Sequence, residues 1–221
     1  MKHLTLATSA LALSVGLSTA AMADGHATKA AVLENYANIA EAKYTDSLIT
    51  AQRLQAAVEE LIANPSAEAL EAAKEAWLAS RVPYQQTEVY RFGNAIVDDW
   101  EGKVNAWPLD EGLIDYVDAS YGGPSDENEY AALNVVANAS FTLSGETVDA
   151  STITPALLEE TLQEADGVEA NVATGYHAIE VLLWGQDLNG HGPGAGNRPW
   201  TDYASGDACT GGNCDRRASY L

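Results

Sequence analysis

One histidine and one glutamate in the second half of the chain have the types and spacing of metal ligands. They are His177 and Glu180, in the segment Gly175-Tyr176-His177-Ala178-Ile179-Glu180-Val181-Leu182-Leu183-Trp184-Gly185. Apolar helix formers and a terminal glycine predict a helix here, and residues three apart leave the same helix face. In helical bundles, an inward-facing Glu and His at this spacing present ligands to iron or manganese. The alternative is a histidine that is only hydrogen-bonded to its neighbour.

The overall charge limits the classes of partner. The chain has 221 residues, enough for one domain with a substantial core, and its formal net charge is −21. Nucleic acid and anionic membrane surfaces are disfavoured as partners because such a charge repels them. Cations, including metal ions, are attracted, although most of the carboxylates are expected to form a solvated surface.

The first 23 residues have the pattern of a cleavable export signal. Lys2 and His3 precede an apolar run from Leu4 to Ala21, and Ala21-Met22-Ala23 is typical of a cleavage site. We therefore expect residues 1–23 to be removed and residues 24–221 to be exported. No later stretch is long and apolar enough to cross a bilayer, so the mature chain is expected to have no membrane span.

Apolar residues at intervals of three and four predict helices over most of the chain. The expected helices cover about Thr28 to Ala63, Pro65 toward Phe92, Ser125 to about Phe141, Thr154 to Glu164, and the segment with His177. Asn64 is expected to cap the second helix and Pro83 to kink or interrupt it. Because no stretch combines strand alternation with hairpin turn signals, the predicted fold is all-α, an antiparallel helical bundle with long irregular connections.

Two irregular segments carry further signals. Residues 93–124 form a long connection rich in carboxylates, and Trp107-Pro108 is expected to hold this connection against the core. The EF-hand pattern is absent there, which disfavours a calcium loop. Farther on, Cys209 and Cys214 are the only cysteines and flank Thr-Gly-Gly-Asn, which predicts a local disulfide in an exported chain.

Four segments in order resemble the imelysin-like family, also called the insulin-cleaving membrane protease family. In chain order, the first two are Arg81-Val82-Pro83-Tyr84-Gln85-Gln86-Thr87-Glu88 and Asn105-Ala106-Trp107-Pro108-Leu109-Asp110-Glu111. The third is Gly175-Tyr176-His177-Ala178-Ile179-Glu180, which matches the signature Gly-x-His-x-x-Glu of the family. The fourth is a tail that includes Arg198-Pro199-Trp200-Thr201-Asp202-Tyr203 and Cys214-Asp215-Arg216-Arg217. The resemblance implies a periplasmic or cell-envelope protein of two related helical bundles. It also implies that the domain of residues 24–221 is incomplete at its C-terminus, because members are about twice as long.

The first function that the resemblance implies is metal binding in the cell envelope. Relatives include iron-regulated envelope proteins and the periplasmic component of a ferrous-iron uptake system, so iron acquisition or homeostasis with an envelope transport partner is expected. Iron is the favoured ion, with zinc or manganese as alternatives, since imidazole and carboxylate ligands suit all three. The predicted ligands are His177, Glu180 and Glu88, with Asp110 and Glu111 as weaker candidates.

Two other interpretations remain open. One is the metal-dependent peptidase that the family name asserts. The zinc signature His-Glu-x-x-His is missing, because His177 has no partner histidine four residues away, so binding is favoured over hydrolysis and no catalytic residue is predicted. The other is an envelope protein whose pocket binds an organic ligand or partner, with His177 and Glu180 only hydrogen-bonded.

Overall fold

The computed structural model describes residues 27–221, so the predicted export signal lies outside the described residues. The described chain divides into two units, of which the first ends at Ala37 and the second covers Asn38–Leu221. The features that follow belong to the second unit, apart from the first residues of the opening helix.

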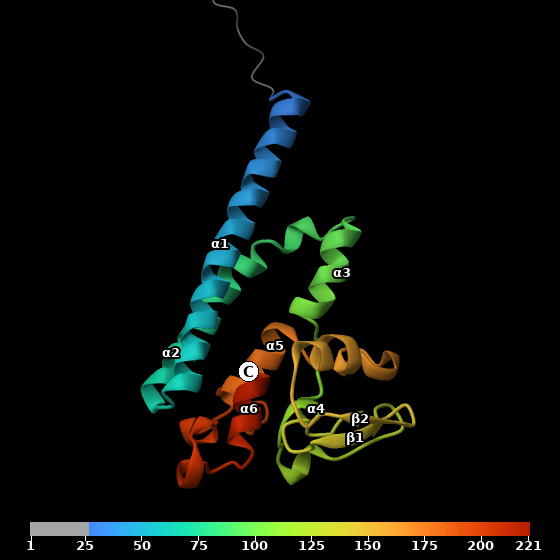
Figure 1. Ribbon diagram of the computed structural model, residues 1–221. Coiled ribbons are helices and arrows are strands. Elements are labelled where there is room, and N and C mark those ends of the chain that lie inside the picture. The colour runs from blue at the N-terminus through green and yellow to red at the C-terminus, as the bar shows by residue number, and fades with distance from the viewer. Residues whose placement is uncertain (1–26) are drawn as a thin grey trace, which may run out of the picture. The chain divides into compact units, whose positions relative to one another are not determined.

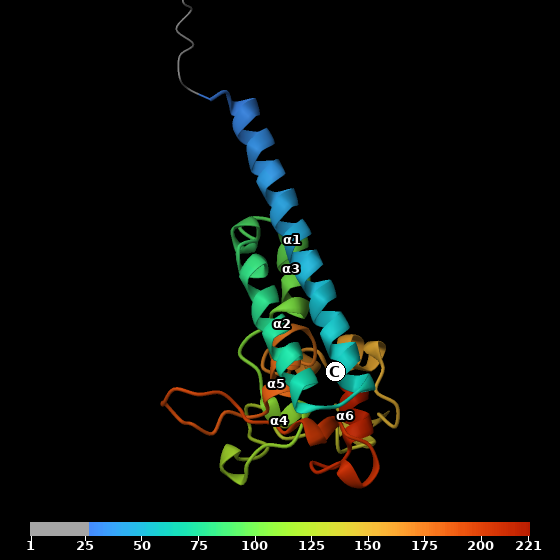
Figure 2. The ribbon, with the colours of Figure 1, turned by 90° about the vertical axis from the view of Figure 1, so that its left-hand side faces the viewer.

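Two long helices open the described chain. α1 spans Lys29–Ala63 and α2 spans Ala67–Gln85, and Figures 1 and 2 show α2 alongside the C-terminal part of α1. Ser66 caps α2, because its Oγ accepts a hydrogen bond from the Ala69 amide at 3.1 Å. The prediction that Asn64 caps this helix is wrong, because the Asn64 side-chain amide donates a hydrogen bond to the Glu60 carboxylate.

Pro83 lies in the last turn of α2. The helix ends at Gln85, and a short 3₁₀ turn, η1, follows at Glu88–Tyr90. A proline lacks the backbone N–H group and crowds the turn that precedes it, yet α2 continues through Pro83 for two more residues. Pro83 therefore does not interrupt the helix, which ends at Gln85 and does not reach Phe92.

The shorter elements that complete the fold are also mainly helical, in agreement with the predicted class. They are α3 (Ala95–Val104), α4 (Glu111–Ile114), η2 (Ala119–Tyr121), η3 (Leu157–Leu162), η4 (Ala165–Gly167), α5 (Gly175–Trp184), η5 (Trp200–Tyr203), η6 (Gly206–Ala208) and α6 (Cys214–Tyr220). The expected turn of helix after Thr154-Pro155 is the π-helical segment η3.

A β-hairpin occupies part of the predicted third helix. β1 (Ser140–Leu143) pairs antiparallel with β2 (Glu146–Asp149). The helix expected from Ser125 to Phe141 is wrong, because turns and loops fill that stretch up to the first strand. Ser144 and Gly145 between the strands both have positive φ, as a two-residue hairpin turn requires.

α5 lies between two clusters of buried apolar residues. Tyr176 and Leu183 belong to a cluster with α1 and α2, whereas Val181 and Leu182 belong to one with α4, the hairpin and η3. A helix that is apolar on several faces is buried in this way. Among residues 27–221, no helix is both long and apolar enough to cross a bilayer.

Candidate functional site

His177 and Glu180 contact each other on one face of α5. The His177 Nδ1 lies 2.8 Å from the Glu180 Oε2. The histidine side chain is 15% exposed and the glutamate side chain 41% exposed, so the pair lies at the boundary between core and solvent. The spacing of three residues therefore brings the two groups together as predicted.

Gly175 brings the start of α5 against the end of α3. Its φ is +86°, and a Cβ at this position would lie 2.4 Å from the carbonyl oxygen of Val104. Only glycine tolerates both the left-handed backbone and this close approach. Thr174 reinforces the same contact, because its hydroxyl donates to the Lys103 carbonyl at 2.8 Å. The glycine that begins the motif is thus needed to place the helix that carries His177.

Trp107 covers the imidazole of His177. The two ring centroids are 4.9 Å apart and the planes are inclined by 54°. The indole is 68% exposed, so the expectation that Trp107 pins its segment against the core is wrong. Its role is local, because an aromatic ring against the imidazole excludes water from one side of it.

Two carboxylates, Glu180 and Asp187, lie within electrostatic range of Glu111. Glu111 begins α4, and Asp187 follows α5. Burial raises the pKa of Glu111 above its ordinary value of 4.5, and the negative charges of Asp187 and Glu180 raise it further. Glu111 is therefore within electrostatic range of both Asp187 and Glu180, the second of which contacts the imidazole. Sequence reasoning did not include Asp187 or Trp107 in the site, because each comes from a separate connection.

The other predicted ligands have different surroundings. Asp110 accepts hydrogen bonds from the Tyr121 hydroxyl at 3.0 Å and the Asn128 amide at 2.5 Å. Glu88 is exposed after α2, where it is one of the charges acting on the Tyr84 phenol. Within residues 27–221, no three His, Cys, Asp or Glu side chains form a group that could hold a metal ion. The third ligand therefore stays a prediction.

The pair has donor types that a metal can use, one imidazole nitrogen and one carboxylate oxygen, at the separation of a hydrogen bond. Nitrogen and oxygen ligands at about 2.1 Å from one ion are about 3 to 3.4 Å apart at octahedral or tetrahedral angles. The Nδ1 and Oε2 atoms are 2.8 Å apart. The two atoms are therefore closer than two ligands of one ion would be, and they form a hydrogen bond.

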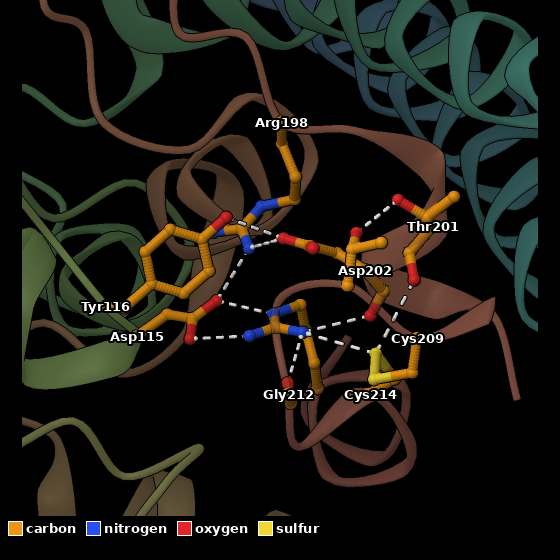
Figure 3. The surroundings of a disulfide bond; sticks show 10 residues. Asp115, Tyr116, Arg198, Thr201, Asp202, Cys209, Gly212 and Cys214 are labelled. Atoms are coloured by element: carbon orange, nitrogen blue, oxygen red, sulfur yellow. Dashed lines mark hydrogen bonds and ion pairs between the residues drawn. A yellow bond between two sulfur atoms is a disulfide. The ribbon is translucent and has the colours of Figure 1, made fainter. Parts of the chain in front are cut away.

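A separate cluster of charged side chains is fully buried beside the disulfide, as Figure 3 shows. Arg217 donates to both carboxylate oxygens of Asp115, at 2.6 and 3.0 Å. Arg198 bridges Asp115 and Asp202, at 2.8 and 2.9 Å. These four side chains, which we call the buried ion network, are at most 1% exposed and their formal charges cancel. They join α4 to η5 and α6 and have a structural role.

The predicted disulfide between Cys209 and Cys214 is present. It closes the loop whose Gly212 carbonyl accepts a hydrogen bond from Arg217 at 3.0 Å. The covalent link therefore holds one acceptor of the buried ion network in place.

The fold and the motif define the class of protein: a mainly helical domain built around a Gly-x-His-x-x-Glu helix. The chain belongs to the Imelysin family (Peptidase_M75), whose sequence profile matches residues 40–219. The "Iron-regulated protein A" of Synechococcus elongatus (strain ATCC 33912 / PCC 7942 / FACHB-805) is 34% identical over 67 residues, which are 30% of this chain and 19% of that protein. The aligned stretch thus spans far less than two thirds of this relative.

We expect Glu111→Gln to raise the melting temperature at pH 7 by about 1–2 °C, a small change because partial exposure screens the charges. A carboxyl group with a raised pKa binds its proton more tightly in the folded chain than in the unfolded chain. Stability is therefore lost as the pH rises above the unfolded pKa, near the ordinary value of 4.5, and glutamine removes that loss. Thermal unfolding followed by circular dichroism from pH 4 to pH 7 measures the difference, which should shrink as the pH falls.

The matched control for this prediction is Glu75→Gln, which removes an exposed carboxylate of α2. It should leave the melting temperature unchanged at both ends of the pH range. A lower melting temperature for Glu111→Gln at pH 7 would contradict the assigned repulsion.

Proposed function

We propose that this chain is an exported cell-envelope protein that binds a metal ion, iron in the first place, through His177 and Glu180. The observation that carries the proposal is the 2.8 Å contact between the imidazole nitrogen and the carboxylate oxygen, with the Glu111 carboxyl in electrostatic range. The neighbouring acids oppose ionisation of Glu111. A bound cation would relieve that repulsion, because it neutralises carboxylates that otherwise repel one another.

Iron is proposed on two grounds. The donors are one imidazole and carboxylates, which suit iron and also manganese or zinc. The relative in Synechococcus elongatus is called an iron-regulated protein, which supports our proposal of a role in iron acquisition or homeostasis. The export signal expected in residues 1–23 supports an envelope location, with residues 24–221 as the mature imelysin-like domain.

The side chains around the pair have separate parts in this proposal. His177 presents Nδ1 and Glu180 presents Oε2, each as one ligand. Trp107 excludes water from one face of the imidazole. Glu111 holds a proton to a higher pH than an ordinary glutamate and releases it when a cation arrives. Since metal ligands must be deprotonated, the affinity should rise with pH.

Isothermal titration with Fe(II) under anaerobic conditions, and with Mn(II) and Zn(II), tests the proposal. His177→Ala and Glu180→Gln should each weaken metal binding at least 10-fold, because each removes a direct ligand. The matched control is His191→Ala, which removes an exposed loop histidine and should leave the affinity unchanged. Equal affinity for the wild type and both site variants, with the fold intact by circular dichroism, would refute the site.

A second pair of variants identifies the third ligand. Glu111→Gln removes the carboxylate within electrostatic range of Glu180, and Glu88→Gln removes the one within electrostatic range of Tyr84. We expect the Glu111 substitution to weaken binding more than the Glu88 substitution. The reverse order would require the turn after α2 to move toward His177 when the metal binds.

A further inference from the structure

An open cavity of about 650 Å³ lies between α1, α3 and the start of α5. Most of its wall is aliphatic or aromatic, and the residues that matter here are Leu54, Val58, Tyr84, Lys103, Tyr176 and Ile179. Cavities of this size and character bind small organic molecules. His177 and Glu180 are not among the lining residues, so the cavity is distinct from the proposed metal site.

Two tyrosine hydroxyls in the wall have no hydrogen-bond partner among the described residues. Tyr84 is 2% exposed and Tyr176 is 6% exposed, and their ring centroids are 4.9 Å apart. The side-chain bonds that reach these two residues end on their backbone carbonyls, which accept from Trp77 and Thr87. Neither hydroxyl oxygen is among the fully buried, unpartnered side-chain atoms of residues 27–221, so both remain accessible although the rest of each residue is buried. Since both residues line the cavity, a ligand inside it can accept a hydrogen bond from each hydroxyl.

The protonation state of Tyr84 suits a donor. Burial raises the pKa of the Tyr84 phenol, and the charge of Glu101 raises it further. The hydroxyl therefore keeps its proton at any physiological pH. It can donate to an oxygen anion but cannot itself supply the negative charge.

The positive groups of the cavity wall lie where α3 meets α5. Lys103 lines the cavity there, and so do Thr174 and Gly175 at the start of α5. The Thr174 hydroxyl does not cap the helix, because it donates to the Lys103 carbonyl. Uncapped amides at a helix start and a lysine ammonium favour an anion. The wall also includes one acidic residue, Glu159, whose charge disfavours an anion.

We propose that this cavity binds an apolar organic acid, a molecule with a hydrocarbon or aromatic body and one carboxylate. The body lies against Leu54, Val58 and Ile179, and the carboxylate accepts hydrogen bonds from the Tyr84 and Tyr176 hydroxyls. This activity goes beyond metal binding and does not depend on it.

Isothermal titration of the full chain with decanoate, in buffer that contains a chelator, tests the proposal independently of any metal. Decanoate should bind saturably, and decanol, which has the same chain but no charge, should bind at least 10-fold more weakly. Tyr84→Phe and Tyr176→Phe keep the rings and remove the hydroxyls, so each should weaken decanoate binding about 3- to 10-fold. The matched control is Tyr121→Phe, which lies outside the cavity and should bind decanoate as the wild type does.

A filling variant tests the location without removing a polar group. Ala51 is part of the cavity wall on α1, so Ala51→Trp should abolish decanoate binding. Ala56→Trp adds the same side chain at an exposed position of the same helix and should have no effect. Unchanged binding to Ala51→Trp, equal affinity for decanol, or the absence of saturable binding to the wild type would each overturn the proposal. The proposal would also be overturned if sedimentation showed that the chain is a dimer and this dimer did not bind decanoate.

Discussion

Arg217→Met should lower the free energy of unfolding by about 3–5 kcal/mol, the cost of leaving a buried charge without its partner. Arg217 is 1% exposed and forms a two-point contact with Asp115, at 2.6 and 3.0 Å. The variant leaves Arg198 alone against two carboxylates, so a neutral cluster becomes a negative one inside the core. Urea unfolding of the disulfide-intact chain measures the loss.

The control for this prediction is Arg53→Met, at an exposed position of α1. It should change the stability by no more than about 0.5 kcal/mol, as surface substitutions usually do. In a double-mutant cycle, Asp115→Asn should cost much less in the Arg217→Met background than in the wild type, because the two residues interact directly. A loss below 1 kcal/mol for Arg217→Met would show that the buried ion network contributes little to stability.

Gly175→Ala should destabilise the chain by about 3 kcal/mol or more, and it should also weaken metal binding. An alanine at positive φ costs about 1–2 kcal/mol by itself. Its Cβ would also lie 2.4 Å from the Val104 carbonyl oxygen, a backbone atom that cannot move without shifting the end of α3. The displaced helix carries His177, so both urea unfolding and the metal titration report the change.

Gly167→Ala separates the two causes. Gly167 has φ +73° and no atom within 4 Å of the Cβ it would carry. This variant should lose only the backbone contribution of about 1–2 kcal/mol and should bind metal as the wild type does. Equal losses for the two glycine variants would show that the contact between α5 and α3 is unimportant.

The long helices and the central motif could be predicted from the sequence because they depend on local order. Apolar periodicity defines α1 and α2, and the spacing of three residues places His177 against Glu180. The disulfide follows from two cysteines in a chain expected to be exported. The resemblance to the imelysin-like family is confirmed by the family match.

The surroundings of the motif could not be predicted, because they depend on contacts between distant segments. Nothing local indicates that Trp107 covers His177 or that Glu111 lies within electrostatic range of Glu180 and Asp187. Asp115 belongs to a segment whose acids suggested a solvated surface or an ion site. It is 1% exposed and paired with two arginines from the tail instead. The composition of one segment does not show which charges are neutralised by another.

The buried ion network also orders events in the synthesis of the chain. Asp115 and Arg217 are 102 positions apart, so at about 5–20 residues per second the arginine leaves the ribosome about 5–20 s after its partner. Arg198, the other partner of Asp115, also lies in the tail, so the aspartate lacks both counter-charges until the end of the chain is made. We therefore expect this part of the core to close only after the tail has left the ribosome.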